Sequence, residues 1–416
     1  MTVVSAAAAA GPWPLAPDLD PALPGLAAAI DPAAVADLFR LRWLDDGPSP
    51  VIRSCALEHA LWRPGLDCVA TYRLDFLERD GESSTLGAVA ISRGGVRHWL
   101  YNTDPALAGL AGASDPRAIG AWLATRLGGA AERYTVAPVR YRAGTRCVLR
   151  YQTRDRDSPP LYGKVVARNG GSDLAAVLAA LGDSLVPPCV GVAPEWQLVV
   201  QHDAGDDSLK AVALDLSGPT AAAFAAAGDL LAQLHAHPAP HGPVRSLAGD
   251  VDELRQLESS LELVNPGAAT KYTHGVAQLE DRNSSGEPMV ASHGAYRADQ
   301  VHRSARGSVM IDLDSYCLAE PARDAANFLA YLHWRAIRGS ASPASVAHAR
   351  DAFMEGYSAG GKRALDAERV RLFEAAAILK IAGRRCRSLS HHEWQHLPAL
   401  IDSALDMLAA ARGSTQ

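Results

Sequence analysis

Hydrophobic and polar positions follow two rhythms along the chain, and the change between them divides it. Up to about residue 202, short apolar runs separated by Gly-containing turns predict strands paired as hairpins. Beyond residue 210, apolar residues recur every three or four positions, which predicts a mostly helical part. The helices predicted there cover residues 220–237, 250–263, 344–358, 366–388 and 397–411. An α+β chain follows from this pattern.

Local signals predict further short elements. Asp followed by Pro is a typical cap and first position of a helix, and clusters of Asn, Pro, Ser and Gly indicate loops. These signals predict irregular structure over residues 1–30, a helix over 31–41, a helix over 172–181, a strand over 196–200, and loops around 265–267 and 283–286.

An internal repeat lies within the strand-rich part. The segment 62–72 reads Trp-Arg-Pro-Gly-x-x-Cys-x-x-x-Tyr, and 79 residues later the segment 141–151 reads Tyr-Arg-Ala-Gly-x-x-Cys-x-x-x-Tyr. Each copy has an extended run, a Gly turn and a second extended run, followed by a third apolar run. The third run carries Lys164 in the second copy and Ala88 at the position we match to it in the first. We interpret the repeat as a duplicated sheet unit, with a coincidence of short motifs as the alternative.

One stretch combines apolar runs with candidate chemistry. Met289–Ala291 is apolar and stops at His293-Gly294, and after a polar loop the run 309–314 ends in two carboxylates, Asp312 and Asp314. Pro321 then begins a predicted helix with apolar residues at helical spacing: Ala325, Phe328, Leu329 and Leu332. Strand, loop, strand and amphipathic helix follow in that order. Polar groups at the ends of two short strands suit a metal and phosphate site.

Composition narrows the class of protein. Of 416 residues, 48% are hydrophobic and 21% charged, which is typical of globular proteins. The net charge of −6 and the lack of a basic stripe argue against a nucleic-acid partner and fit a cationic or neutral small substrate. Six scattered Cys without metal or disulfide spacing, no signal-peptide pattern and no run of 18 apolar residues predict a cytoplasmic protein without a membrane segment. Oligomeric state cannot be read from the sequence.

The stretch from His293 to Asp324 resembles the aminoglycoside phosphotransferase/choline kinase-like (APH) family of the protein-kinase fold. That family has His-Gly-Asp, a ligand amide five residues beyond the Asp, and then Ile-Asp-(Phe/Leu)-Asp. Here His293-Gly294 match, Gln300 supplies the amide, and Asp312 stands at the metal-binding position. The pattern fails at one residue: Ala295 occupies the place of the catalytic Asp.

The resemblance implies a bilobal kinase-like fold with an added N-terminal unit, as in maltokinase-like members. It divides the chain into a cap over 1–131 that repeats the small-lobe hairpin, a kinase-like N-lobe over 132–202 and a helical C-lobe over 203–416. It also implies ATP and Mg²⁺ as cofactors and a small molecule as substrate.

Site residues are implied in the same way. Lys164 would contact nucleotide phosphates, Asp173 would replace the usual Glu that holds this Lys, and His202 would open the hinge beside the nucleotide. Gln300 and Asp312 would bind the metal, while Asp314 is either a second ligand or a cap. Finally, His293 and Asp324 would position the loop, the latter as the family's helix aspartate.

Three functions remain open at this point. The first is ATP/Mg-dependent O-phosphotransfer to a hydroxyl of a small molecule, with Asp299 replacing the lost base. Arg297 would bind a phosphate or a substrate carboxylate, or both loop residues would simply be solvated. The second is a pseudokinase that binds a nucleotide or metabolite. The third is a repurposed biosynthetic enzyme on the same fold, including one that phosphorylates Ser or Thr of a peptide.

Overall fold

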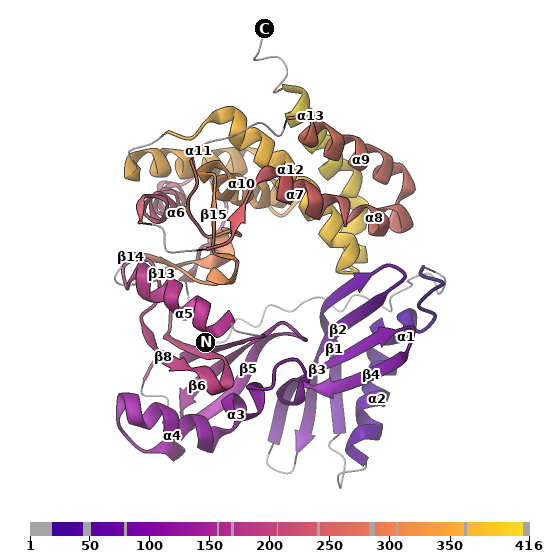
Figure 1. Ribbon diagram of the computed structural model, residues 1–416, viewed down its shortest axis with the longest axis vertical. Coiled ribbons are helices and arrows are strands. Elements are labelled where there is room, and N and C mark those ends of the chain that lie inside the picture. The colour runs from indigo at the N-terminus through magenta and orange to yellow at the C-terminus, as the bar shows by residue number, and fades with distance from the viewer. Residues whose placement is uncertain are drawn as a thin grey trace.

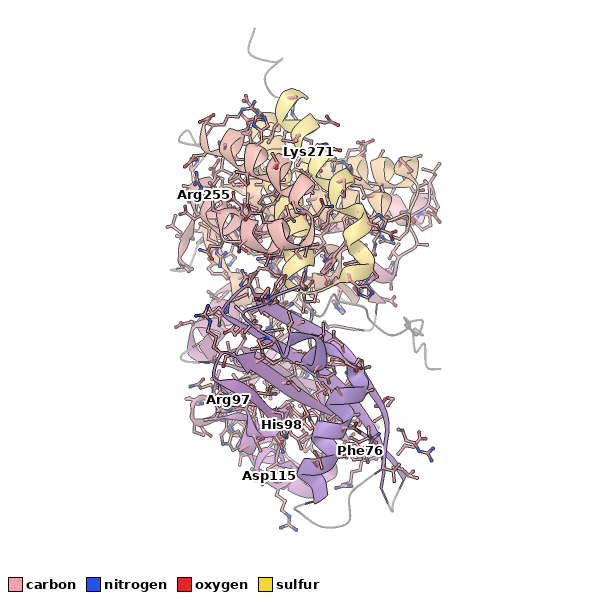
Figure 2. All side chains as sticks on the ribbon, turned by 90° about the vertical axis from the view of Figure 1, so that its right-hand side faces the viewer. Phe76, Arg97, His98, Asp115, Arg255 and Lys271 are labelled. Carbon is pink, nitrogen blue, oxygen red and sulfur yellow. The ribbon has the colours of Figure 1, made fainter. Side chains whose placement is uncertain are left out.

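The structure is a computed structural model, in which two sheets stand beside each other below a helical part (Figure 1). It describes residues 19–44, 51–78, 81–155, 158–167, 170–205, 207–238, 242–282, 288–304, 307–361 and 364–410. The view turned by 90° shows the same division, with Arg97 and His98 on the first sheet and Arg255 and Lys271 on the helices above (Figure 2).

The first sheet is an antiparallel meander of four long strands in sequence order. Two helices precede it, so the predicted irregular segment 1–30 already contains a helical turn where it is described. The elements are α1 (Leu26–Ile30), α2 (Pro32–Leu44), β1 (Val51–Arg63), β2 (Asp67–Glu78), β3 (Gly81–Ser92) and β4 (Gly95–Leu100). The predicted helix from residue 31 is confirmed, and the Asp31 carboxylate accepts a hydrogen bond from Ala33 N–H in its first turn.

The second sheet has five antiparallel strands in the order β5-β6-β7-β9-β8. Short helices precede it, and α5 stands between its third and fourth strands. The elements are α3 (Leu110–Ser114), α4 (Pro116–Leu127), β5 (Tyr134–Arg142), β6 (Arg146–Thr153), β7 (Leu161–Val166), α5 (Gly170–Leu181), β8 (Cys189–Ala193) and β9 (Leu198–His202). The predicted hairpins and the helix to residue 181 are confirmed. The strand predicted over 196–200 is confirmed from Leu198 onward, whereas Trp196 ends a short 3-10 helix.

The two sheets repeat each other down to single hydrogen bonds. Asp20 accepts from Trp62 Nε1 at 2.8 Å and from Gly65 N at 2.9 Å, at the turn between β1 and β2. At the turn between β5 and β6, Asp104 accepts from Tyr141 O–H at 2.5 Å and from Gly144 N at 2.7 Å. Both carboxylates are at least 96% buried. A buried Asp holding a Gly turn is therefore part of the duplicated unit, and the sequence repeat alone did not include it.

Strand register corrects one detail of the repeat. Val69 and Val148 occupy equivalent positions, each one residue after the repeated Cys, and they pair with Ala90 and Lys164. The residue of the first sheet that corresponds to Lys164 is thus Ala90, and the match to Ala88 was wrong by two positions. A shift of two keeps the side chain on the same face of the sheet, so apolar patterning could not reveal it.

The helical part contains the helices from α6 onward and two small three-stranded sheets. Its helices are α6 (Gly218–Ala236), α7 (Leu247–Arg255), α8 (Glu258–Val264), α9 (Pro266–Glu280), α10 (Pro321–Ile337), α11 (Pro343–Gly360), α12 (Ala367–Arg387) and α13 (Leu397–Ala410). Its strands are β10 (Asp207–Ser208), β11 (Val244–Arg245), β12 (Val290–Ser292), β13 (Val301–Ser304), β14 (Gly307–Met310) and β15 (Cys317–Ala319). Most predicted helices are confirmed, and the four apolar residues of α10 singled out by spacing are buried.

Two predictions in this part are wrong. The single helix over 250–263 is two helices, α7 and α8, that meet near Gln256. The loop predicted around 265–267 is the beginning of α9, because Asn265 caps it by accepting from Ala268 N at 3.0 Å and Pro266 takes the first position. Asn and Pro thus mark a helix start here. The other predicted loop, 283–286, lies outside the described residues.

The first sheet contacts both other parts of the molecule. Trp99 Nε1 of β4 donates to Tyr141 Oη at 2.7 Å in the second sheet. Arg387 Nε of α12 donates to Trp62 O at 3.3 Å, and Leu389 is buried in the same apolar core as the β1 and β2 side chains. The first sheet therefore contacts the second sheet through β4 and the helical part through the hairpin end of β1 and β2. Within the described residues, no helix has the length and apolar content needed to cross a membrane.

Candidate active site

The centre of the site is a cluster of two cations and two carboxylates. Lys164 Nζ of β7 lies 2.6 Å from Asp312 Oδ1 and 2.6 Å from Asp314 Oδ1. Arg146, the first residue of β6, donates to Asp314 and lies 3.2 Å from Asp312 Oδ1. All four side chains are between 13% and 18% exposed. Sheet residues thus pair with carboxylates of the helical part across the junction between them.

Asp312 is held in an uncommon conformation by its surroundings. Its φ is +67°, in the left-handed region that a residue with a side chain adopts at a cost. Burial alone would raise the pKa of its carboxyl, but the charges of Lys164 and Arg146 outweigh burial and lower that pKa well below its usual value. Asp312 is therefore an ionised carboxylate in a largely enclosed site.

The loop before it is fixed by Asp324 of α10. This buried carboxylate accepts from His293 N at 2.6 Å and from Gly294 N at 2.9 Å. Burial would raise the pKa of Asp324, but the nearby His235, whose Nε2 lies 3.7 Å from Asp324 Oδ2, lowers it together with His293 and Arg323. His293 Nε2 is 2.9 Å from Ile311 O, so the loop is also tied to the residue before Asp312.

Gly294 is required where it stands. Its φ is +78°, and a Cβ there would lie 1.9 Å from Ser315 O. Its own carbonyl accepts from Arg323 Nη1 at 3.0 Å, and Arg323 is in turn held by two hydrogen bonds of 2.8 Å to Asp250. Lys380 Nζ of α12 donates to the same Asp250 at 3.0 Å. This second support of the loop has no signal in the sequence, because its residues come from three separate helices.

The loop after Gly294 carries no carboxylate at its first position. Ala295 is half-buried, and Tyr296 beside it is fully buried. Asp299 lies farther along, with its Oδ1 3.1 Å from Arg297 Nε. The Arg297 guanidinium also lies 4.9 Å from the centre of the Tyr331 ring. Asp299 and Arg297 are thus paired with each other, and not merely solvated.

Gln300 is the side chain in this loop that best fits a metal. It is 3% exposed, and its Oε1 has no hydrogen-bond partner. Its backbone carbonyl accepts from Ile311 N at 2.9 Å, which places it next to Asp312 in the fold. The described residues contain no group of three His, Cys, Asp or Glu arranged for a metal. Two carboxylates and one buried amide oxygen are the donors available, and Mg²⁺ accepts such a set with water and phosphate.

Two predicted residues lie apart from this cluster. Asp173 of α5 is exposed, and Lys164 is held by Asp312 and Asp314 instead, so the predicted pairing of Lys164 with Asp173 was wrong. Asp173 has a shorter side chain than the Glu expected on this helix, and Lys164 is already paired with two other carboxylates. His202 ends β9 and is exposed, and its N–H donates to Pro188 O at 2.9 Å.

Arg146 is the main residue that sequence reasoning missed. It stands at an unspecified position of the repeated motif, immediately before Cys147, where the first copy has Asp67. The two copies of the repeat are otherwise similar, so this change from a negative to a positive residue is the sequence signal by which Arg146 could have been identified. It indicates that only the second sheet faces a pair of carboxylates.

Comparison with known proteins relates this site to a known family. The profile described as "Phosphotransferase enzyme family" (APH) matches residues 168–373, which include the loop, Asp312 and Asp324. Over these residues the chain is similar to that family. No curated protein sequence matches it.

Solved structures of phosphotransferases resemble the chain in fold. Choline kinase from Cryptosporidium parvum Iowa II superposes with a TM-score of 0.54 at 11% identity, covering 72% of this chain and 97% of its own. A choline kinase from Streptococcus pneumoniae gives 0.47 at 13% identity, covering 70% and 98%. A glucosamine kinase gives 0.48 at 17% identity, covering 86% and 94%. The first of these confirms the predicted bilobal kinase-like α+β fold, while the maltokinase-like branch stays a prediction.

Proposed function

We propose that the protein transfers the γ-phosphoryl group of Mg-ATP to an oxygen atom of a small molecule. The observation that carries this is the cluster of Lys164 and Arg146 with Asp312 and Asp314. A nucleotide phosphate needs cations, and its metal ion needs oxygen anions. The cluster supplies the cations from the second sheet and the carboxylates from the helical part.

Each half of the cluster has a defined role in this proposal. Lys164 and Arg146 would bind the phosphates, while Asp312, Asp314 and the unpartnered Gln300 Oε1 would hold Mg²⁺. When bound, the metal neutralises phosphate charge. Because the cations and carboxylates now neutralise each other, binding would exchange these partners without leaving a charge unpaired. The hinge from His202 would lie beside the nucleotide base, and Asp173 is left without a part in the site.

A hydroxyl acceptor would also need a base, because its proton must leave during transfer. Asp299 is the loop carboxylate available for that role, although Arg297 already pairs with it. A second candidate function, nucleotide binding without transfer, is favoured by Ala295 alone. Phosphoryl transfer depends chiefly on position and charge, which the remaining residues supply.

Calorimetric titration with ATP, with and without Mg²⁺, tests the proposal. We expect saturable binding that requires Mg²⁺ for full affinity, and loss of about tenfold or more affinity in Asp312→Ala, since a charged metal ligand is removed. ATP consumption should then be followed with amino alcohols, sugars and small acids as acceptors. Full affinity and turnover in Asp312→Ala would refute the proposal, whereas tight Mg-ATP binding with no consumption for any acceptor would favour the nucleotide-binding function.

A further inference from the structure

Two arginines at the site have no task in the proposed nucleotide binding. Arg142 ends β5 and stands directly opposite Arg146 in the sheet, an unfavourable pairing of like charges. Its Nε is shielded from solvent and has no hydrogen-bond partner. A buried N–H group without a hydrogen-bond partner costs free energy, and a ligand that accepts a hydrogen bond from it would remove that cost.

Arg297 has the same feature from the other side. It lies in the loop two residues after Ala295, and its Nε is shielded from solvent. The nearby Asp299 Oδ1, at 3.1 Å, lacks the alignment of a hydrogen bond. The arginine is also stacked near Tyr331, which keeps the guanidinium in place.

Strand pairing and hydrogen bonds bring both arginines toward Asp312. Arg142 faces Arg146, which lies 3.2 Å from Asp312 Oδ1. Arg297 O accepts from Gln300 N at 3.0 Å, and Gln300 O accepts from Ile311 N, beside Asp312, at 2.9 Å.

The electrostatics agree with this placement. Burial, then the charges of Arg146 and Arg140, lower the pKa of Arg142 to about 10; Asp312 opposes the shift, and Arg297 adds to it. His59 of β1 faces the same arginines, since burial and then Arg142, Arg140 and Arg146 lower its pKa to about 4. A neutral His59 adds no compensating charge. Through His59, the first sheet thus comes near these arginines.

We infer that the acceptor is a small carboxylate, held between Arg142 and Arg297, whose oxygen is already anionic, so that no base is needed at position 295. This inference rests on the proposed function and names its substrate class. A carboxyl group has a pKa of about 4 and carries no proton at neutral pH. Arginine binds a carboxylate through two parallel hydrogen bonds, which suits unpartnered guanidinium N–H groups.

The chemistry balances without a proton transfer. A carboxylate oxygen forms a bond to the γ-phosphorus, and the bond from that phosphorus to the bridging oxygen breaks. The electron pair of that bond stays on the nucleoside diphosphate, which leaves. The product is an acyl phosphate. An Asp at position 295 would add a negative charge near such a nucleophile, so Ala295 becomes a fitting residue here.

Binding of small anions gives the first test. The full-length protein, saturated with Mg²⁺ and a non-hydrolysable ATP analogue so that Lys164 and Arg146 are occupied, is titrated with succinate and separately with inorganic phosphate. We expect saturable succinate binding that is weaker by about tenfold in Arg142→Gln and Arg297→Gln. Arg150→Gln is the matched control, because Arg150 is exposed on β6 and bonds only Gln152 among the described contacts.

The outcomes separate this inference from the proposed function. No succinate binding to the protein saturated with the analogue, equal binding in Arg297→Gln, or binding of phosphate alone would overturn the carboxylate site while leaving the kinase proposal intact. Failure of the analogue itself to bind would overturn the kinase proposal instead.

Trapping of the product gives the second test. With Mg-ATP, small carboxylic acids and hydroxylamine, an acyl phosphate is converted to a hydroxamate, whereas a phosphate ester of an alcohol is not. Hydroxamate formation that falls in Arg297→Gln, with unchanged thermal stability, supports the inference. ATP consumption that depends on an alcohol and increases in Ala295→Asp would overturn it, because a restored base helps only a nucleophile that must lose a proton.

Discussion

Lys164 Nζ lies 2.6 Å from Asp312 Oδ1, although the two residues are 148 positions apart in the sequence. One belongs to a strand of the second sheet, and the other to the turn after β14 in the helical part. The contact is therefore a bond between two lobes as well as a pairing of charges. In a kinase-like fold, a ligand that enters between the lobes must replace such contacts.

Replacing Lys164 tests whether this contact stabilises the fold and whether Lys164 binds the nucleotide. Lys164→Met keeps the length of the side chain but leaves two carboxylates with Arg146 alone, so the free energy of unfolding should fall by about 1–3 kcal/mol. Mg-ATP affinity should also fall, measured by calorimetry. Lys210→Met, at an exposed lysine, is the control and should change neither. Unchanged Mg-ATP affinity in Lys164→Met would contradict the assigned role.

Gly294 should tolerate no side chain. In Gly294→Ala, the left-handed φ and the contact of the new Cβ with Ser315 O together predict a loss of about 2–5 kcal/mol in unfolding free energy. Gly339→Ala separates the two causes, because its φ is +70° with no atom within 4 Å of the new Cβ. It should lose only about 1–2 kcal/mol. Equal losses in denaturant titrations would show that the close contact is absent.

Asp250 predicts a pH dependence of stability. Burial would raise the pKa of its carboxyl, but Arg323 and Lys380 lower it. A carboxyl with a lowered folded-state pKa adds stability above its unfolded pKa of about 4, and this stability is lost as the pH falls toward the folded value. At pH 7, Asp250→Asn should be less stable by about 3 kcal/mol.

That difference should shrink between pH 5 and pH 3, as measured by denaturant unfolding at several pH values. Asp252→Asn, at an exposed position of the same helix, should match the unsubstituted protein throughout. A constant difference across the pH range would mean that lost packing, rather than charge, explains the effect.

Asp20 and Asp104, the buried carboxylates at the two Gly turns, should contribute equally to stability but differently to nucleotide binding. Asp20→Ala and Asp104→Ala each remove a buried acceptor from a Gly turn, with an expected loss of about 2–4 kcal/mol. Only Asp104 supports the turn that carries Arg146, so only Asp104→Ala should weaken Mg-ATP binding. Equal weakening in both variants, measured at a temperature where each remains folded, would link the first sheet directly to nucleotide binding.

Much of the architecture was predictable because it depends on local pattern. Helical spacing of apolar residues gave α11, α12 and α13 nearly to their ends, and Gly turns between apolar runs gave both hairpins. One prediction failed because a local signal is found in two kinds of structure. Asn265-Pro266 is typical of a loop, but the same pair also begins a helix. The residues after it, which form α9, determine that it begins a helix here. The grouping of His293, Gly294 and Asp324 in one motif was implied by the resemblance to the APH family.

By itself, the sequence predicted a kinase-like loop without its Asp, because Ala295 stands where the motif that this stretch resembles has that residue. The tertiary structure decided which charges meet. Lys164 pairs with Asp312 and Asp314 rather than Asp173, Arg146 joins them, and Arg142 and Arg297 approach the same region from separate lobes. Charges act through space over several ångströms, and residues so far apart in sequence become neighbours only when the chain folds.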